Sequence, residues 1–406
     1  MTSPHPGAGR GPGGKVSVVG RRASLQPLSR LDPGLRRGTG SISRRSVIAG
    51  AGALALPGCA AGVRPATAHA ACLPRVNVAA DRVIRTLVGL RPYRPSGFVV
   101  RAESFGDKTL VHNYGHGGSG ITLSWGTSRL ATNLGLPGHQ GPVAVLGAGV
   151  VGLTTARLVQ EAGYPVTIYA EALPPETTSN IAGGQWYPSI LYDSDKLTPA
   201  FEQQLVAAAS YAYQRYQIMI GDDYGVRWMT NYLLSDRAPG DSDTDRLMQS
   251  MLPEARDLGA GARGFDYKYV GQFDGMLIEP PRFLRAMLRD IRIAGGRVDV
   301  RAFASPAEVA ALPENLVFNC TGLGAGALFG DDEITPMRGQ LAVLLPQPEV
   351  DYAVETGNGM YMFSRSDGVI LGGTADRGDW STEVDPATTQ RLIARHSAIA
   401  RRLACA

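Results

Sequence analysis

The stretch that most constrains this chain runs from residue 143 to residue 171, VAVLGAGVVGLTTARLVQEAGYPVTIYAE. An apolar run at 143–146 predicts a buried strand, and G-x-G-x-x-G follows at 147–152. Apolar residues then recur at helical spacing until Gly163, after which 166–169 predicts a second strand with Glu171 at its end. This order is typical of a βαβ unit that binds a dinucleotide.

Each part of the stretch has a role in dinucleotide binding. Gly147 permits a tight turn, Gly149 lets the backbone approach a pyrophosphate, and Gly152 lets the helix pack on the strand. The helix N-terminus offers free N–H groups and a positive dipole to the phosphates. Glu171 can accept hydrogen bonds from a ribose and disfavours a 2′-phosphate, so we expect FAD or NAD rather than NADP. An ordinary glycine turn is the alternative, but it does not explain the ordered neighbours.

The first 70 residues are interpreted as an export signal. A twin-arginine motif, SRRSVI at 43–48, precedes a small apolar run at 49–61 that is too short to span a membrane. The sequence Ala68-His69-Ala70 is typical of a cleavage site, and Cys59 in LPGC is an alternative site for a lipid anchor. We therefore predict export by the twin-arginine machinery to the periplasm, to the outside of the cell, or to an anchor at Cys59. An arginine-rich disordered tail is the alternative.

Charge argues against nucleic acid as a partner. The formal net charge of the 406 residues is +4, of which residues 1–70 contribute +9, so the chain from Ala71 onward is near −5. The four cysteines, Cys59, Cys72, Cys320 and Cys405, form no C-x-x-C pair, which argues against a metal or thioredoxin-like site. Cys320 lies in an apolar strand, where we expect it to be inert packing.

The remaining patterns predict two further binding loops and a second domain. Residues 82–103 predict two strands around a turn, and HNYGHGGSG at 112–120 is too rich in glycine and aromatic residues for a plain turn. TTSNIAGGQW at 177–186 suits a loop that faces a cofactor, and equally suits any turn. Helices are expected at 121–134, 198–222, 279–294 and 386–405, and strands at 298–300, 316–322, 340–345, 359–363 and 369–373.

These elements predict an α/β fold class, with a Rossmann-like FAD-binding domain and a second α+β substrate domain built on an antiparallel sheet. The expected boundaries are 1–70 (signal), 71–111 (substrate-domain strands), 112–137 (flavin loop and helix), 141–186 (dinucleotide unit), 187–278 (substrate domain), 279–335 (return to the FAD-binding domain) and 336–406 (substrate-domain sheet and final helix).

Taken together, the chain resembles the D-amino-acid oxidase family of FAD enzymes, which includes D-aspartate oxidase. The motifs that carry the resemblance are VAVLGAGVVGLTTA, IYAE, TTSNIAGGQW, FNCTG with AGAL, PMRGQ, VILGGTADRGDW, GLRPYRP and HNYGHGGSGITLSWG, which span nearly all of 82–385. In the family, GLRPYRP and HNYGHGG follow the strand domain near the C-terminus, whereas here they precede the dinucleotide motif. The resemblance therefore implies a circular permutation. It also implies that Cys72 and Cys405 are neighbours, and we predict a disulfide between them in an oxidising compartment.

The resemblance implies three substrate-binding residues. Arg91 would bind the substrate carboxylate, because a guanidinium fork matches a carboxylate bidentately. The alternative role for such an arginine, a surface salt bridge, fits Arg94 better. Tyr361 would help to hold the carboxylate through its hydroxyl, and Gly118 would offer its backbone carbonyl to the substrate amine.

One position departs from the family pattern. The second active-site tyrosine of the family falls at Gly357 here and is missing. Tyr352 is a candidate to replace it.

The resemblance also implies a set of cofactor contacts. For the dinucleotide part they are Gly147, Gly149, Val150, Val151, Gly152, Glu171, Thr177, Thr178, Gly184, Gln185, Trp186 and Gly322. For the pyrimidine end of the flavin they are Gly117, Ser119, Gly120, Ile121 and Thr122, where N–H and hydroxyl donors favour an anionic reduced flavin.

The implied activity is oxidation of a D-amino acid by hydride transfer to flavin N5, giving a 2-oxo acid and ammonia, with dioxygen reduced to hydrogen peroxide. The alternatives are a related FAD enzyme for acidic D-amino acids or N-methyl amines, a NAD enzyme, and an exported FAD-binding protein without catalysis. A basic side chain in the pocket would favour acidic substrates, and Arg365 is the candidate. Besides substrate, dioxygen and the export machinery, the expected partner is a second copy in a homodimer.

Overall fold

The computed structural model describes residues 73–240 and 242–404. The predictions for the twin-arginine motif, Cys59, the cleavage site, Cys72 and Cys405 lie outside the described residues. Within these ranges, no helix combines the length and the apolar character that a transmembrane span requires.

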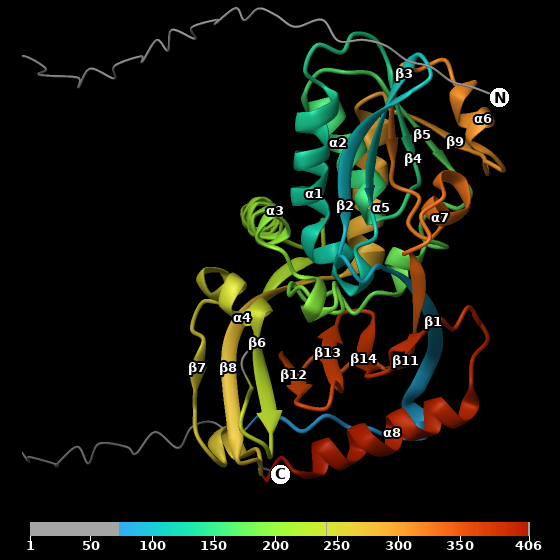
Figure 1. Ribbon diagram of the computed structural model, residues 1–406. Helices are drawn as coiled ribbons and strands as arrows, with labels where there is room; N and C mark the ends of the chain where they lie inside the picture. Colours follow the sequence, from blue (N-terminus) through green and yellow to red (C-terminus); the bar gives the residue numbers. More distant parts are fainter. Residues whose placement is uncertain (1–72, 241, 405–406) are drawn as a thin grey trace, which may run out of the picture. The chain divides into compact units, whose positions relative to one another are not determined.

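The first of two sheets carries the predicted dinucleotide unit (Figure 1). Its six strands follow the order β2-β3-β10-β4-β5-β9, and all neighbours are parallel except β2 and β3. The strands β4, β5 and β10 are buried along their whole length, as expected for a parallel sheet covered on both faces. The bounds are β2 (Val99–Phe105), β3 (Lys108–Tyr114), β4 (Val143–Leu146), β5 (Val166–Ala170), β9 (Arg297–Val300) and β10 (Leu316–Asn319).

Helices pack on both faces of this sheet. On one face α1 packs against α2 and α3, α2 packs against α5, and their apolar side chains share one core with β4 and β5. On the other face Val309 of α6 joins Leu110, Leu146 and Val317. The bounds are α1 (Gly120–Gly135), α2 (Val150–Glu161), α3 (Pro199–Gln217), α5 (Pro280–Ile293), α6 (Pro306–Ala310) and α7 (Gly324–Phe329).

The second sheet has nine strands and is mostly antiparallel. Its order is β1-β11-β14-β13-β12-β6-β8-β7, with β15 paired to β11, and only β12 and β6 run parallel. The bounds are β1 (Val83–Tyr93), β6 (Val226–Ser235), β7 (Arg256–Asp257), β8 (Tyr269–Ile278), β11 (Thr335–Leu344), β12 (Tyr352–Thr356), β13 (Tyr361–Arg365), β14 (Gly368–Gly372) and β15 (Asp376–Arg377). The fold class predicted from the sequence is confirmed.

The helix α8 (Pro386–Arg401) packs against β11 and β14 of the second sheet. In Figure 1 it runs below the labelled strands of this sheet. Asp385 caps this helix by accepting from the N–H groups of Ala387 and Thr388, and Pro386 occupies its first turn. The short elements that remain are α4 (Asp243–Met248) and the 3₁₀ helices at Ala80–Arg82, Gly117–Ser119, Thr178–Ile181, Ser194–Lys196, Gln249–Met251 and Ala262–Gly264.

The two ends of the described chain meet beneath the second sheet. Arg75 donates to the carbonyl of Leu403 at 2.5 Å, and the hydroxyl of Tyr352 donates to the carbonyl of Pro74 at 2.7 Å. Leu73 packs against the cluster that contains Leu403.

Several sequence-based boundaries need correction. The strand expected within 99–103 was assigned to the substrate domain, but it is β2, which pairs with β3 in the parallel sheet. The helix expected at 198–222 ends at Gln217, and the last helix ends at Arg401. The short helix α4 was not among the helices expected from the sequence; Ser242 caps it by accepting from the N–H of Asp245.

Candidate functional site

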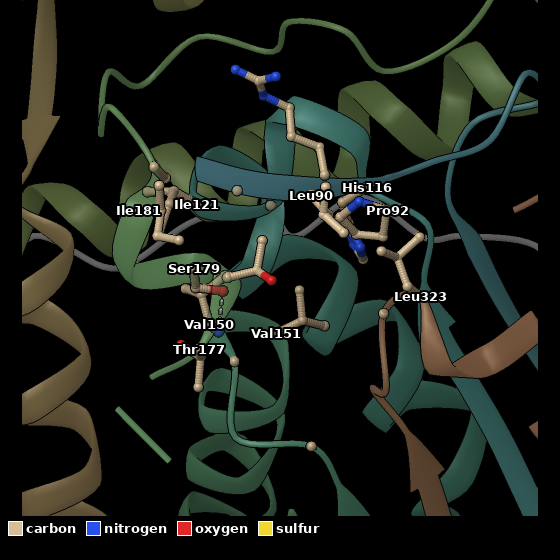
Figure 2. A pocket seen from close by; sticks show the side chains of 18 of the residues that line it. Leu90, Pro92, His116, Ile121, Val150, Val151, Thr177, Ser179, Ile181 and Leu323 are labelled. Carbon is tan, nitrogen blue, oxygen red and sulfur yellow. Dashed lines mark hydrogen bonds between the residues drawn. The ribbon is translucent and has the colours of Figure 1, made fainter. Parts of the chain in front are cut away.

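A cavity of about 790 Å³ lies at the carboxyl ends of the parallel strands and extends to the second sheet. Figure 2 shows part of its wall, with Val150, Thr177 and Ser179 gathered at the start of α2 and Leu90, Pro92 and Leu323 farther along. Of the predicted cofactor residues, those that line the cavity are Gly117, Gly120, Ile121, Gly147, Gly149, Val150, Val151, Glu171, Thr177, Thr178, Gly184, Gln185 and Gly322.

The glycines of the βαβ unit are required by close backbone contacts. Gly147 has φ +103°, and a Cβ there would lie 2.5 Å from the carbonyl oxygen of Cys320. A Cβ at Gly152 would collide with the carbonyl oxygen of Gly147, so this glycine brings the helix against the strand and does not line the cavity itself. Gly149 stands at the N-cap of α2, where Ser179 Oγ accepts from the N–H of Val150 at 3.0 Å.

The far end of the cavity carries the predicted acid together with two residues that the sequence reasoning missed. Glu171 follows β5 and lines the cavity. Arg301 and Phe303, from the segment after β9, line the same end, and the Arg301 guanidinium lies 4.6 Å from the centre of the Phe303 ring. The signal that could have found them is positional, because β9 is parallel to β5 and its carboxyl end therefore lies at the same edge.

Trp186 is not a cavity residue, and its prediction as a cofactor contact is wrong. Its side chain is fully buried in the helical core, with its ring 4.9 Å from the ring of Tyr213. Gln185 and Tyr187 on either side do line the cavity. The cause is the extended backbone, in which successive side chains point in opposite directions. Gly184 precedes them with φ +102°, which favours glycine.

The glycine-rich loop before α1 divides into residues that line the cavity and residues that position its wall. Ser119 and Thr122, predicted to touch the flavin, do not line the cavity. Ser119 Oγ instead donates to the carbonyl of Ser189 and accepts from its N–H, both at 2.9 Å. Thr122 Oγ1 donates to the carbonyl of Tyr187 at 3.1 Å. These two hydroxyls fix the opposite loop against α1.

His116 is the histidine of this loop, and Figure 2 shows it in the cavity wall. Its Nε2 lies 2.9 Å from Thr127 Oγ1. Burial lowers the pKa of His116 to about 3, so the ring is neutral at physiological pH. Gly118 also lines the cavity, and its N–H donates to the carbonyl of Ile190 at 3.0 Å.

Arg91 brings a positive charge into the cavity from β1. Its Nη1 makes long hydrogen bonds to the carbonyls of Met337 (3.4 Å) and Thr374 (3.3 Å). Among the residues that the structure describes, it has no carboxylate within 4.0 Å. Arg94 does pair, with Asp331 at 2.7 Å and with Glu333, as expected for the arginine assigned to a salt bridge. The role of Arg91 in substrate binding stays a prediction.

Tyr361 lies in the wall formed by the second sheet. It is stacked on Phe363, with ring centres 4.8 Å apart, and both line the cavity. Glu355 of β12 is the register partner of Tyr361 and lines the cavity beside it. Burial raises the pKa of the Glu355 carboxyl, against a hydrogen bond from Gln185 that lowers it.

Glu355 and Tyr187 are cavity residues that the sequence reasoning missed. For Glu355, the available signal was a lone acid at the end of an otherwise apolar strand, Tyr352 to Val354. Tyr187 donates its hydroxyl to Asp245, and burial raises its pKa. The signal for Tyr187 was the alternation of side-chain direction along the extended loop, which puts Tyr187 on the same side as Gln185.

Tyr352 does not replace the missing tyrosine. It is three residues from Glu355 on the same strand and so faces the opposite side of the sheet, among Tyr232 and Phe265. A Cβ at Gly357 would lie 2.9 Å from Ser235 Oγ. Arg365, the candidate for binding acidic substrates, does not line the cavity: it is 4% exposed and pairs with Asp367 at 2.6 Å.

Cys320 is buried, as predicted, and burial raises the pKa of its thiol to about 12. In the described part of the chain, no cluster of three or more His, Cys, Asp or Glu residues is placed to hold a metal ion.

The FAD dependent oxidoreductase (DAO) family profile matches residues 63–134 and 142–404. The chain is similar to the D-amino-acid oxidase of Rubrobacter xylanophilus, with 32% identity over 266 residues, 64% of this chain and 77% of the relative. It is similar to the D-amino-acid oxidase of Streptomyces coelicolor, with 32% identity over 272 residues, 66% of this chain and 80% of the relative. It is also similar to the D-aspartate oxidase of Homo sapiens, with 28% identity over 262 residues, 63% of this chain and 75% of the relative.

Proposed function

Because the chain belongs to the DAO family of FAD-dependent oxidoreductases, we propose that it oxidises D-amino acids to 2-oxo acids, releasing ammonia and hydrogen peroxide. The observation that carries the proposal is the Arg91 guanidinium, which no described carboxylate pairs with, in the same cavity as the βαβ glycines. The two bacterial relatives named D-amino-acid oxidase support it.

The cavity fits FAD, the cofactor of this family. Gly147 and Gly149 line the cavity at the start of α2 and carry no side chain that would occupy the space of a pyrophosphate, and the N-terminus of α2 provides donors and a positive dipole. Glu171 is placed to accept from a ribose, with Arg301 and Phe303 beside it for an adenine. The buried Nδ2 of Asn180, which has no hydrogen-bond partner among the described residues, lies in the same loop as Thr177 and Thr178.

When bound, FAD supplies the hydride acceptor and passes the electrons to dioxygen. The chain's own residues bind and orient the substrate. Arg91 holds the α-carboxylate with two parallel N–H donors, and the Tyr361 hydroxyl donates to the same group. Gly118 accepts from the substrate amine through its carbonyl oxygen. The apolar rings of Tyr361 and Phe363 exclude water from the reacting carbon.

Side-chain acid–base catalysis is not part of this proposal. His116 stays neutral, and its Nε2 is engaged with Thr127. The reaction then depends on orientation, which alone can contribute several orders of magnitude in rate.

The direct test is a peroxide assay of the FAD-loaded protein with D-alanine and L-alanine in air. We expect peroxide to form with the D-isomer and not with the L-isomer. Equal turnover of both isomers, or of neither, contradicts the proposal.

We further propose that the gene is circularly permuted. The family profile matches in two segments separated at 135–141, and the described ends of the chain meet where Arg75 donates to Leu403. Moving residues 73–137 behind residue 404 restores the family order. That rearranged protein should fold and bind FAD, and its failure to do so opposes the permutation.

We also propose export by the twin-arginine route, supported by SRRSVI at 43–48. Replacing Arg44 and Arg45 together with lysine should retain the protein in the cytoplasm, and unchanged export contradicts the proposal. A Cys72–Cys405 disulfide is part of the same proposal, since Leu73 and Leu403 share a cluster. Mass spectrometry of unreduced peptides should detect the linked pair, and two free thiols would exclude it.

A further inference from the structure

The wall of the cavity contains a half-buried carboxylate that the proposed reaction does not use. Glu355 lies near the end of β12, one strand from Tyr361, and lines the cavity. Its neighbour in the other direction is Leu233 of β6, an apolar residue. A carboxylate in this position is exposed to whatever molecule occupies the cavity.

Among the described residues, the only hydrogen bond to the Glu355 carboxylate comes from a neutral amide. Asn231 Nδ2 donates to the carbonyl of Met229 at 2.9 Å, so Asn231 Oδ1 is the acceptor for Gln185 Nε2, also at 2.9 Å. The same Gln185 nitrogen donates to Glu355 Oε1. These hydrogen bonds fix the orientation of the Gln185 amide, so that its NH₂ group faces one carboxylate oxygen of Glu355.

In the part of the chain that the structure describes, no cation compensates this carboxylate. Among the described residues, no Lys, Arg or His nitrogen lies within 4.0 Å of Glu355. The nearby charge of Asp245 has the same sign and acts, like burial, to raise the pKa of Glu355. A buried carboxylate without a cationic partner is unfavourable, and a cation delivered by a ligand would relieve that cost.

Arg91 is the opposite case, a cation without a carboxylate partner among the described residues. In the order β1-β11-β14-β13-β12, four strand spacings separate the two residues. At about 4.8 Å each, these correspond to roughly 19 Å across the sheet. The row of Glu355 and Tyr361 continues to Leu87 on β1, so Arg91 is also displaced by four residues along the strands, about 13 Å, which gives roughly 23 Å between the two backbones. Two long side chains directed into the cavity shorten this distance. Tyr361 and Phe363 line the wall between them. The cavity therefore has a cationic end, an apolar middle and an anionic end.

We propose that Glu355 makes this site selective for D-amino acids with a cationic side chain. Its carboxylate pairs with the side-chain ammonium or guanidinium while Arg91 holds the α-carboxylate. This inference rests on the proposed function, because it assigns the substrate class of the same site. It disfavours acidic D-amino acids, whose side chains would meet a like charge.

The first test measures binding without turnover. The probes are 6-aminohexanoate, which carries a carboxylate and a terminal ammonium but no α-amine, and hexanoate, its uncharged-tail counterpart. Binding to the FAD-loaded protein at pH 8 is followed by the change in the flavin spectrum. We expect 6-aminohexanoate to bind on the order of 10-fold or more tighter, because it alone forms the second charge pair.

The matched variants are Glu355→Gln and Glu349→Gln, the latter at an exposed acid in the loop between β11 and β12. The preference should disappear in the first variant and persist in the second. Equal binding of the two probes to the unaltered protein overturns the inference whether or not Glu355→Gln folds.

The second test compares oxidation of D-lysine and D-norleucine, which differ only in the terminal ammonium. We expect kcat/KM to favour D-lysine in the unaltered protein and in Glu349→Gln, and to favour neither in Glu355→Gln. If Glu355→Gln loses both substrates equally, the carboxylate serves the shared α-amine and the selectivity is excluded. If no D-amino acid is oxidised but 6-aminohexanoate still binds preferentially, the proposed reaction is wrong while the charge pair stands.

Discussion

Glu355 and Tyr361 are register partners across the antiparallel strands β12 and β13, and both line the cavity. Three strand spacings beyond Tyr361, Arg91 enters the same cavity from β1. The second sheet thus presents a cation, an aromatic hydroxyl and a carboxylate to one cavity, while the βαβ unit closes the cavity from the other side.

Replacing Arg91 with alanine should lower kcat/KM for D-alanine. Losing one partner of a desolvated charge pair costs about 2–5 kcal/mol, or roughly 30-fold or more in kcat/KM. The control is Arg85→Ala on the same strand, since Arg85 pairs with Asp367 and is 43% exposed at its side chain. Steady-state kinetics decide the matter, and equal losses in the two variants would remove Arg91 from substrate binding.

Two tyrosine variants test which face of the second sheet serves the substrate. Tyr361→Phe should lower kcat/KM by about 10-fold or more, because a hydrogen bond to a charged group contributes about 1.5–3 kcal/mol. Tyr352→Phe should leave kcat/KM unchanged and lower the free energy of unfolding by about 1 kcal/mol, since it loses only the bond to Pro74. Activity that responds to Tyr352 instead would show that our assignment of the two faces is wrong.

Two glycine variants separate backbone strain from cofactor binding. Gly147→Ala should lose FAD affinity, because its Cβ would press on the carbonyl of Cys320. Gly163→Ala imposes a similar φ of +90°, compared with +103°, but its Cβ meets nothing within 4 Å. Both should lose about 1–3 kcal/mol of stability from the positive φ. Fluorescence titration with FAD should detect weakened binding in Gly147→Ala only.

Stability should fall as the pH drops below 6.5. Burial lowers the pKa of His396 to about 4, while its Nε2 donates to the carbonyl of Gly372 at 2.9 Å. A lowered histidine pKa means that the unfolded chain binds the proton first, so stability is complete above pH 6.5 and is lost progressively down to about pH 4. At pH 5 the loss from this histidine is about 2 kcal/mol.

The measurement for this prediction is urea unfolding of the FAD-loaded protein at pH 7 and pH 5, in the unaltered chain and in His396→Gln. His116, with its pKa lowered to about 3, adds to the slope in both proteins. The variant should lose less stability between the two pH values. If the unaltered chain and the variant lost the same stability between pH 7 and pH 5, folding would not lower the pKa of His396.

The sequence predicted the elements whose signals are local. The strand at 143–146, the glycines and the helix that ends before Gly163 form one continuous pattern, and the structure reproduces it as β4, α2 and β5. The assignment of β2 could not be obtained this way. Its sheet is determined by the pairing of β3 with β10, whose partners Thr109 and Leu316 lie far apart in sequence.

Side-chain direction was the second source of error. Trp186 was taken as a cofactor contact because its neighbours were, but the alternation of extended backbone turns it into the core between Gln185 and Tyr187. The same alternation puts Tyr352 and Glu355 on opposite faces of β12. Family resemblance predicted roles for Arg91 and Tyr361 but none for Glu355. The lone acid at the end of an apolar strand was visible in the sequence, but only the register of β12 with β13 shows that it lies beside Tyr361.

The most direct test of the central claim is anaerobic reduction of the FAD-loaded protein. D-Alanine, D-lysine, L-alanine and D-aspartate are added separately, and the flavin absorbance is followed, with Arg91→Ala as the control. We predict rapid bleaching by D-lysine, slower bleaching by D-alanine and none by L-alanine, with bleaching in the Arg91→Ala variant slower by roughly 30-fold or more. Bleaching by L-alanine, or none by any D-amino acid, would contradict the account.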